Sequence, residues 1–122
     1  MDKAQALHDF WSGFGLPAYD EASVPDDAPL PRITYNVATD SLNNQVSLYA
    51  NLWYRDTSWK AISQLADTIA ERVKGQGYAI KTFDGGYIYI MAGTPFAQRI
   101  SDPDQDIKRI YINLQAEFLC AY

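Results

Sequence analysis

The sequence predicts an α+β domain in which a single, mostly antiparallel sheet of about five strands carries its helices on one face, in the order α-β-β-α-β-β-β. Apolar and polar residues alternate over 46–55 and again over 109–120, and this period of two is typical of half-buried antiparallel strands. Between them, apolar residues recur at three- and four-residue spacing over 59–73, which indicates an amphipathic helix. Each element exposes one apolar face, so we expect the helix to pack across the sheet.

The strand predicted at 46–55 and the helix that follows it define the two faces of the predicted sheet. One side of the strand carries Val46, Leu48, Ala50, Leu52 and Tyr54, and the other carries Ser47, Tyr49, Asn51, Trp53 and Arg55. The helix is predicted over 58–74, with an apolar stripe of Trp59, Ile62, Leu65, Ala66, Ile69 and Val73. Asp56, Thr57 or Ser58 can cap its first turn, and Gly75 or Gly77 can end it.

The N-terminal part is predicted to be a helix followed by an extended arm. Residues 1–15 form the helix, which ends at Gly13 or Gly15 and has an apolar stripe of Ala4, Leu7, Phe10, Trp11 and Phe14. Residues 16–31 hold four prolines and four acidic residues, and proline fixes φ and removes hydrogen-bond donors, so an extended arm is expected. A first strand then follows, in which Ile33, Tyr35 and Val37 alternate with polar residues.

The C-terminal part is predicted to be three strands. Strands at 78–83 and 87–92 flank Asp84-Gly85-Gly86, a turn sequence that tolerates positive φ and favours a hairpin. Residues 93–106 are predicted to be a loop, because they contain Gly93, Pro95 and Pro103. The last strand covers 109–120. Together, residues 32–122 are predicted to form the sheet and the central helix, and the whole chain 1–122 a single domain.

The composition excludes several classes of protein. With 122 residues, 48% hydrophobic and 14% aromatic, the chain is long and apolar enough to bury a core. Its net charge of −5 argues against sequence-independent nucleic-acid binding, which needs a basic surface. One cysteine cannot form an internal disulfide, and the longest apolar run, 87–92, is too short to span a bilayer. We therefore expect a soluble protein of a reducing compartment.

No combination of residues points to catalysis, a cofactor or a metal. His8 is the only histidine and is expected to be a partly buried helix residue, and Cys120 lies on the apolar side of the last strand. Asp102, Asp104 and Asp106 alternate as in a calcium loop, but the sixth position is Ile107 instead of glycine and the twelfth is Asn113 instead of glutamate. A solvated acidic turn is the better interpretation. We expect no enzyme activity.

One feature does point toward a function. The wetter face of the predicted sheet, which is the more polar one, is rich in aromatic residues. Tyr49 and Trp53 lie on one long strand and Tyr111 on the other. The first helix and the proline arm can cover this face. Alternatively it is a subunit interface, since tyrosine and tryptophan are enriched where proteins assemble.

Four blocks of residues follow one another along nearly the whole chain: 29–36 (PLPRITYN), 52–60 (LWYRDTSWK), 93–99 (GTPFAQR) with 101–104 (SDPD), and 109–114 (RIYINL). In these blocks and their order, the chain resembles the small tail-terminator proteins (also called tail-completion or head-tail joining proteins) of long-tailed bacteriophages and prophages. The resemblance implies a hexameric ring that caps the tail tube, ends tube polymerisation and joins the tail to the head connector. It implies no catalytic residue and no cofactor. The expected partners are other copies of the chain, the tail tube protein and the head-tail connector protein, and the expected location is the virion tail, assembled in the bacterial cytoplasm.

The candidate assembly interface consists of five residues: Tyr49, Trp53, Phe96, Arg99 and Tyr111. An acidic protein also suits a DNA conduit, because negative walls do not retain the phosphate backbone. A ligand-binding or regulatory α+β domain that dimerises through its sheet is the alternative, and an enzyme with scattered Tyr, Asp and Arg residues is a third. The sequence leaves open the oligomeric state of the free protein, the loops that contact tube or connector, whether turn 102–106 lines the channel, and whether the parent phage is viable.

Overall fold

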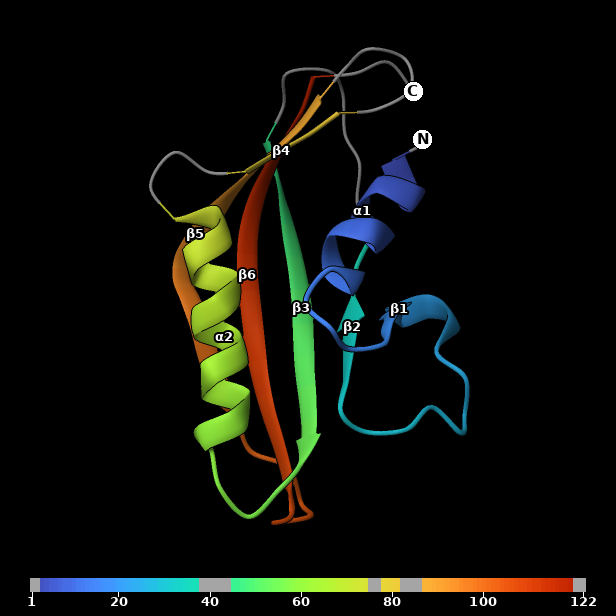
Figure 1. Ribbon diagram of the computed structural model, residues 1–122, viewed down its shortest axis with the longest axis vertical. Helices are drawn as coiled ribbons and strands as arrows, with labels where there is room; N and C mark the ends of the chain where they lie inside the picture. The colour runs from blue at the N-terminus through green and yellow to red at the C-terminus, as the bar shows by residue number, and fades with distance from the viewer. Residues whose placement is uncertain (1–2, 38–44, 75–77, 82–86, 120–122) are drawn as a thin grey trace.

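The centre of the structure is a twisted sheet built on two long strands (Figure 1). The computed structural model describes residues 3–37, 45–74, 78–81 and 87–119. Strands β3 (Gln45–Arg55) and β6 (Ile107–Leu119) pair antiparallel along the whole of β3. The sheet has six strands in the order β1-β2-β3-β6-β5-β4, and all neighbours except β1 and β2 are antiparallel. The predicted α+β class is confirmed.

Helix α2 (Lys60–Val73) forms as its sequence predicts. The Lys60 N–H donates to Ser58 Oγ at 3.1 Å and the Ser58 N–H donates to Asp56 Oδ1 at 3.1 Å, so the two polar residues before the helix organise its start. The buried residues are Ile62, Leu65, Ala66, Ile69 and Val73. Trp59, predicted on the same stripe, precedes the helix and is half-buried. The predicted stops, Gly75 and Gly77, lie outside the described residues.

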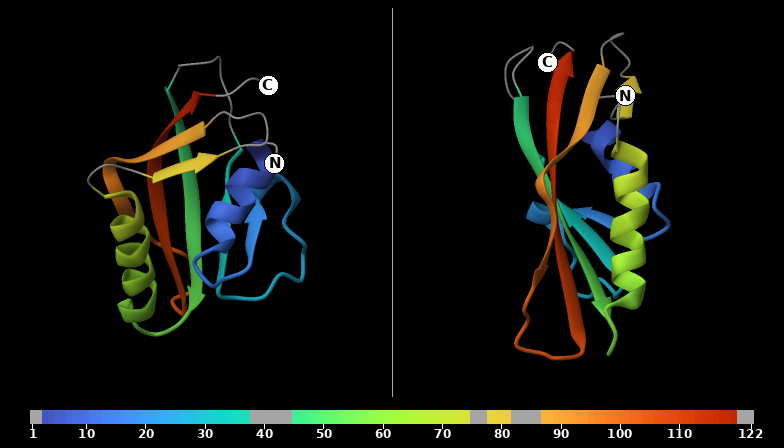
Figure 2. Two further views of the ribbon diagram at one scale, coloured as in Figure 1. Left: turned by 45° about the horizontal axis from the view of Figure 1, so that its top comes forward. Right: turned by 90° about the vertical axis from the view of Figure 1, so that its left-hand side faces the viewer.

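Helix α1 (Lys3–Ser12) lies on the same side of the sheet as α2. Figure 2, right, shows both helices on one side. The Trp11 ring stacks on the Tyr35 ring with centroids 6.4 Å apart, and the guanidinium of Arg72 lies 4.5 Å from the centroid of Phe14. The helices therefore share one core, and the expectation that the first helix covers the wetter face is wrong.

The apolar stripe of α1 differs slightly from the prediction. Ala6 is buried and Ala4 is exposed, whereas Ala4 was expected inside. The pairs Ala6–Phe10 and Leu7–Trp11, each four residues apart, form the centre of the buried stripe, and this turns Ala4 outward. His8 is exposed on this helix, and not partly buried as predicted. Its Nδ1 lies 3.1 Å from the Tyr35 hydroxyl.

The proline arm contains regular structure that the sequence did not reveal. Strand β1 (Ala18–Asp20) pairs in parallel with β2 (Arg32–Tyr35), and a short 3₁₀ helix η1 (Glu21–Ser23) follows β1. The Ile33 N–H donates to the Pro17 carbonyl at 2.9 Å, which extends this pairing. The free edge of β2 has unpaired backbone groups, and the arm satisfies them. The sheet thus gains a sixth, parallel strand.

Strand β5 (Tyr87–Ile100) runs through the segment predicted to be a loop. It pairs with β4 (Tyr78–Lys81) and β6, and the predicted 84–86 turn lies outside the described residues. Ala92 pairs with Leu114 and Ala97 with Ile112, so residues 93–96 oppose Asn113 alone. The glycine and proline mark an irregularity within a strand, and pairing with β6 continues beyond it.

This irregularity reverses the alternation of β5. Before it, Ile88 and Ile90 are buried under the helices, whereas after it Ala97 and Arg99 lie opposite the helix-side residues Ile112 and Ile110. The buried residues of both helices and of the sheet form one hydrophobic core cluster. No helix in the described ranges is long and apolar enough to cross a membrane.

Candidate assembly surfaces

The sheet face opposite the helices, here called the outer face, carries a row of residues on three neighbouring strands. Arg32 on β2 pairs with Trp53 on β3, and Trp53 pairs with Arg109 on β6. The next row consists of Thr34, Asn51 and Tyr111. Strand pairing therefore places the aromatic residues of this face among polar and basic ones.

Trp53 is held between two arginines. Its Nε1–H donates to Thr34 Oγ1 at 3.0 Å, which fixes the orientation of the half-exposed indole. The guanidinium carbons of Arg109 and Arg32 lie 4.6 and 5.4 Å from the ring centroid. Each such contact contributes about 0.5–1 kcal/mol at an exposed site, so the three side chains form a preorganised unit. We call it the Arg-Trp-Arg cluster.

The two arginines of this cluster have no carboxylate partner among the described residues. Arg109 Nε donates to Asn51 Oδ1 at 2.9 Å, and Arg32 Nη1 donates to the Ala28 carbonyl at 2.8 Å. The Arg32 Nε is buried and has no hydrogen-bond acceptor in the described part of the chain. An unpaired buried donor is unfavourable, and two uncompensated positive charges attract an anionic group.

Beside the cluster, a cleft of about 450 Å³ separates the arm from the sheet. Its lining combines apolar arm residues with charged strand residues: Ala28, Pro29, Leu30, Arg32, Trp53, Arg55, Asp102 and Ile107. Arg55 pairs with Asp104 at 3.4 Å, but both side chains are at least half exposed, so this ion pair contributes little stability. The cleft thus reaches from the cluster to the β5–β6 hairpin.

The tyrosines of the outer face lie next to the arm. The Tyr49 and Tyr111 rings contact edge to face, with centroids 5.6 Å apart, and the Tyr49 hydroxyl donates to Glu21 Oε1 at 2.5 Å. This hydrogen bond, with burial and the negative charge of Glu21, raises the pKa of Tyr49 above its ordinary value. Helix η1 is thereby attached to the outer face, so the arm borders this face while half-exposed aromatic and basic residues remain on it.

The other two candidate residues, Phe96 and Arg99, lie on the opposite, helix side of the sheet. The Arg99 guanidinium lies 4.7 Å from the centroid of Trp59, before α2. Phe96 packs against the core beside α2. The reversed alternation of β5 accounts for the helix-side position of Arg99, whereas Phe96 lies within the irregularity itself. The structure therefore brings Tyr49, Trp53 and Tyr111 together and places Phe96 and Arg99 apart from them.

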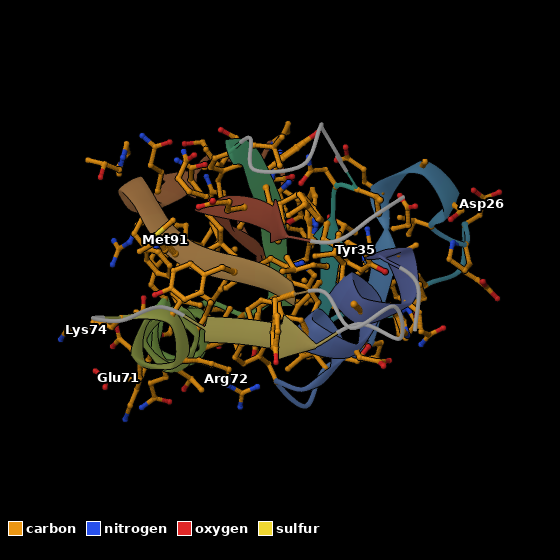
Figure 3. All side chains as sticks on the ribbon, turned by 90° about the horizontal axis from the view of Figure 1, so that it is seen from above. Asp26, Tyr35, Glu71, Arg72, Lys74 and Met91 are labelled. Atoms are coloured by element: carbon orange, nitrogen blue, oxygen red, sulfur yellow. The ribbon has the colours of Figure 1, made fainter. Side chains whose placement is uncertain are left out.

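Phe96 forms the floor of a groove along α2, with a volume of about 490 Å³. We call it the α2 groove, and its lining comprises Asp67, Ala70, Glu71, Lys74, Ala92 and Phe96. Asp67 and Glu71 are exposed at its rim, and Figure 3 shows Glu71 and Lys74 projecting outward from α2. Glu71 and Lys74 are 3.9 Å apart with about three quarters of each side chain exposed, so this pair is weak. The groove thus has an apolar floor and a charged rim of two carboxylates and one lysine.

The aspartates of turn 102–106 organise the tip of the β5–β6 hairpin. The Asp104 N–H donates to Asp102 Oδ1 at 3.0 Å and the Asp106 N–H donates to Asp104 Oδ1 at 2.9 Å. These local hydrogen bonds give the acidic residues a structural role in the turn. Within the described ranges, no group of three or more His, Cys, Asp or Glu residues is arranged to hold a metal ion. Cys120 lies outside these ranges.

The sequence pattern alone does not single out Arg32 and Arg109. Both alternate with apolar residues on predicted strands, so their sheet face could be predicted, but their position on either side of Trp53 depends on strand order and register. A basic residue and a tryptophan on the same face of separate strands is the signal that could have found them.

Comparison with known proteins relates the fold to a virus-like particle. No family model matches the chain, and no curated protein sequence matches it. Among solved structures, the chain is similar to a chain of the "virion of native gene transfer agent (GTA) particle", with a TM-score of 0.55 and 14% sequence identity. The alignment covers 95% of this chain and 87% of the other. At this identity the likeness shows a shared fold over nearly the whole of both chains.

Proposed function

We propose that this chain is a structural protein of a phage-like virion, specifically a tail terminator that forms a hexameric ring, caps the tail tube and joins the tail to the head connector. The observation that carries the proposal is the fold shared with a chain of a gene transfer agent virion, over nearly the full length of both chains. The ordered resemblance of four sequence blocks to tail-terminator proteins supports the finer assignment. The proposal gives the protein no catalytic role and places it in the virion tail.

The geometry of the two candidate surfaces supports an assembling protein. A ring requires one patch of a subunit to meet a different patch of its neighbour. Here the Arg-Trp-Arg cluster and the α2 groove lie on opposite sides of one rigid sheet, and each combines an aromatic residue with charged residues. Aromatic residues and arginines carry much of the binding energy at protein interfaces.

Complementation of a phage or prophage that lacks this chain tests the proposal. We expect lysates without the chain to contain overlong or unjoined tails, and the added protein to restore tails of fixed length that join heads. Trp53→Ala and Phe96→Ala are expected to reduce this restoration while the proteins remain folded. Asp9→Ala, at an exposed position of α1 that lines neither surface, is the control. Normal tail length and head joining in the absence of the chain would refute the terminator role.

A further inference from the structure

We propose that the Arg-Trp-Arg cluster on the outer face of one copy binds the acidic α2 groove of a second copy, so that the two surfaces form a head-to-tail contact. This inference rests on the assembly role proposed above and names the partner of the outer face. It assigns Arg32, Arg109 and Arg55 to one side of the contact, and Asp67 and Glu71 to the other.

The charges of the two surfaces are complementary. The chain carries a net charge of −5, yet the outer face holds two arginines without a carboxylate partner among the described residues. On the groove side, Asp67 and Glu71 are exposed, and the ion pair of Glu71 with Lys74 is long and solvated. An arriving carboxylate would give the two guanidiniums the anionic partner that they lack, and guanidinium–carboxylate hydrogen bonds are the strong, charge-assisted kind.

The apolar parts of the two surfaces are complementary as well. Trp53 is half-exposed between its arginines, next to the apolar arm residues Pro29 and Leu30 of the cleft. The α2 groove offers Ala70, Ala92 and Phe96 beside the charged side chains of its rim. Contact would therefore bury an aromatic centre surrounded by charge pairs, which is the usual anatomy of a specific interface.

The position of the surfaces determines the symmetry of the contact. The Arg-Trp-Arg cluster lies on the outer face of the sheet, and the α2 groove lies on the face that carries α2 (the side of α2 is seen in Figure 2, right), so a chain cannot close the contact on itself. Two outer faces meeting each other would oppose arginine to arginine, and two grooves would oppose carboxylate to carboxylate, and like charges in an interface are costly. Different patches therefore meet, and such heterologous contacts propagate into a ring or a filament.

Site-directed cross-linking of the full-length protein tests this contact. In a Cys120→Ser background, one variant carries Ala28→Cys in the cleft and the other Lys74→Cys beside the groove, two positions that the proposal does not assign to the contact. With a short bis-maleimide, we expect a cross-linked dimer only when the two variants are mixed, and a ladder of oligomers from a chain with both cysteines. A cross-linked dimer from either variant alone, or no product from the mixture, would overturn the proposal.

A charge reversal supplies the matched comparison. Asp67→Lys in the Lys74→Cys chain is expected to lower the yield of mixed dimer at least about tenfold, because a lysine then faces the arginines. Asp9→Lys makes the same change of charge at an exposed position of α1 and is expected to leave the yield unchanged. Equal losses from both would mean that overall charge, and not the groove, controls association.

Cross-linking and complementation fail separately. If mixed dimers form but tails are normal without the chain, the contact stands and the terminator role falls. If complementation succeeds but the mixture gives no product, the terminator role stands and this interface is wrong.

Discussion

Replacing Gly93 with alanine is expected to destabilise the fold through one backbone contact. Gly93 is buried in the irregular part of β5, opposite Asn113 of β6. A Cβ at this position would lie 2.5 Å from Asn113 Nδ2, 2.8 Å from its Cγ and 2.8 Å from its carbonyl oxygen. The Asn113 side chain can rotate away, but its carbonyl oxygen is part of the backbone of β6 and cannot move in this way. We expect a loss near the upper end of the range of about 1–3 kcal/mol that overpacking costs.

Urea unfolding of a matched set of variants measures this effect. At Gly13, a Cβ would lie 3.2 Å from the mobile end of Arg72 and 3.3 Å from the Phe10 carbonyl, so Gly13→Ala is expected to change the free energy of unfolding by less than about 1 kcal/mol. In an Asn113→Ala background, Gly93→Ala should cost less, because the side-chain clash is gone, but still more than Gly13→Ala, because the carbonyl remains. A Gly93→Ala protein as stable as the wild type would refute the described path of β5.

Three further predictions concern the core, the tyrosines and the acidic turn. Ile69→Ala, at a fully buried position, should cost about 2–5 kcal/mol in denaturant melts and the exposed Asp67→Ala about 0.5 kcal/mol or less; similar losses would mean that the buried face of α2 is misassigned. The pKa of Tyr49 is raised above 10.0, so the stabilisation from its hydrogen bond to Glu21 is complete below pH 10 and is lost as the pH rises through the folded-state pKa. In an ultraviolet titration, Glu21→Gln should shift this tyrosine to ionise at lower pH. An unchanged titration would contradict the hydrogen bond. Millimolar calcium should not change the melting temperature, whereas a large increase that Asp104→Ala abolishes would indicate a real site.

Local sequence patterns predicted the elements whose buried face follows from the periodicity of a single segment. The alternation of β3 and β6 and the stripe of α2 match their burial, because a period of two or 3.6 is a property of one segment. The same alternation placed Tyr49, Trp53 and Tyr111 on one face, where the structure has them. Their role in assembly stays a prediction.

What could not be predicted depends on pairing between distant segments. Pro95 and Gly93 favour a loop when read locally, but β6 offers backbone partners on both sides of them, so β5 continues. The reversed alternation that follows sends Arg99 to the helix side, and no local period records such a change. The pairing of β1 with β2 is equally nonlocal, since β1 pairs with the backbone groups at the edge of β2, a strand that follows the prolines of the arm.

A closed ring requires the two contact surfaces of a subunit to keep a fixed angle, since a small error repeats at every contact and turns a ring into an open helix. In this chain the surfaces are carried by β3, β5 and β6, which share continuous ladders on both sides of β6. Helix α2 packs on the same strands through Ile62, Ile69 and Val73. No linker separates the Arg-Trp-Arg cluster from the α2 groove, so the twist of the sheet sets their angle. The arm is attached differently, through the three-residue strand β1 and through single hydrogen bonds such as those from Tyr49 to Glu21 and from Arg32 to the Ala28 carbonyl. In the proposed ring, the arm would therefore adjust at each contact, while the sheet would determine how many subunits close the ring.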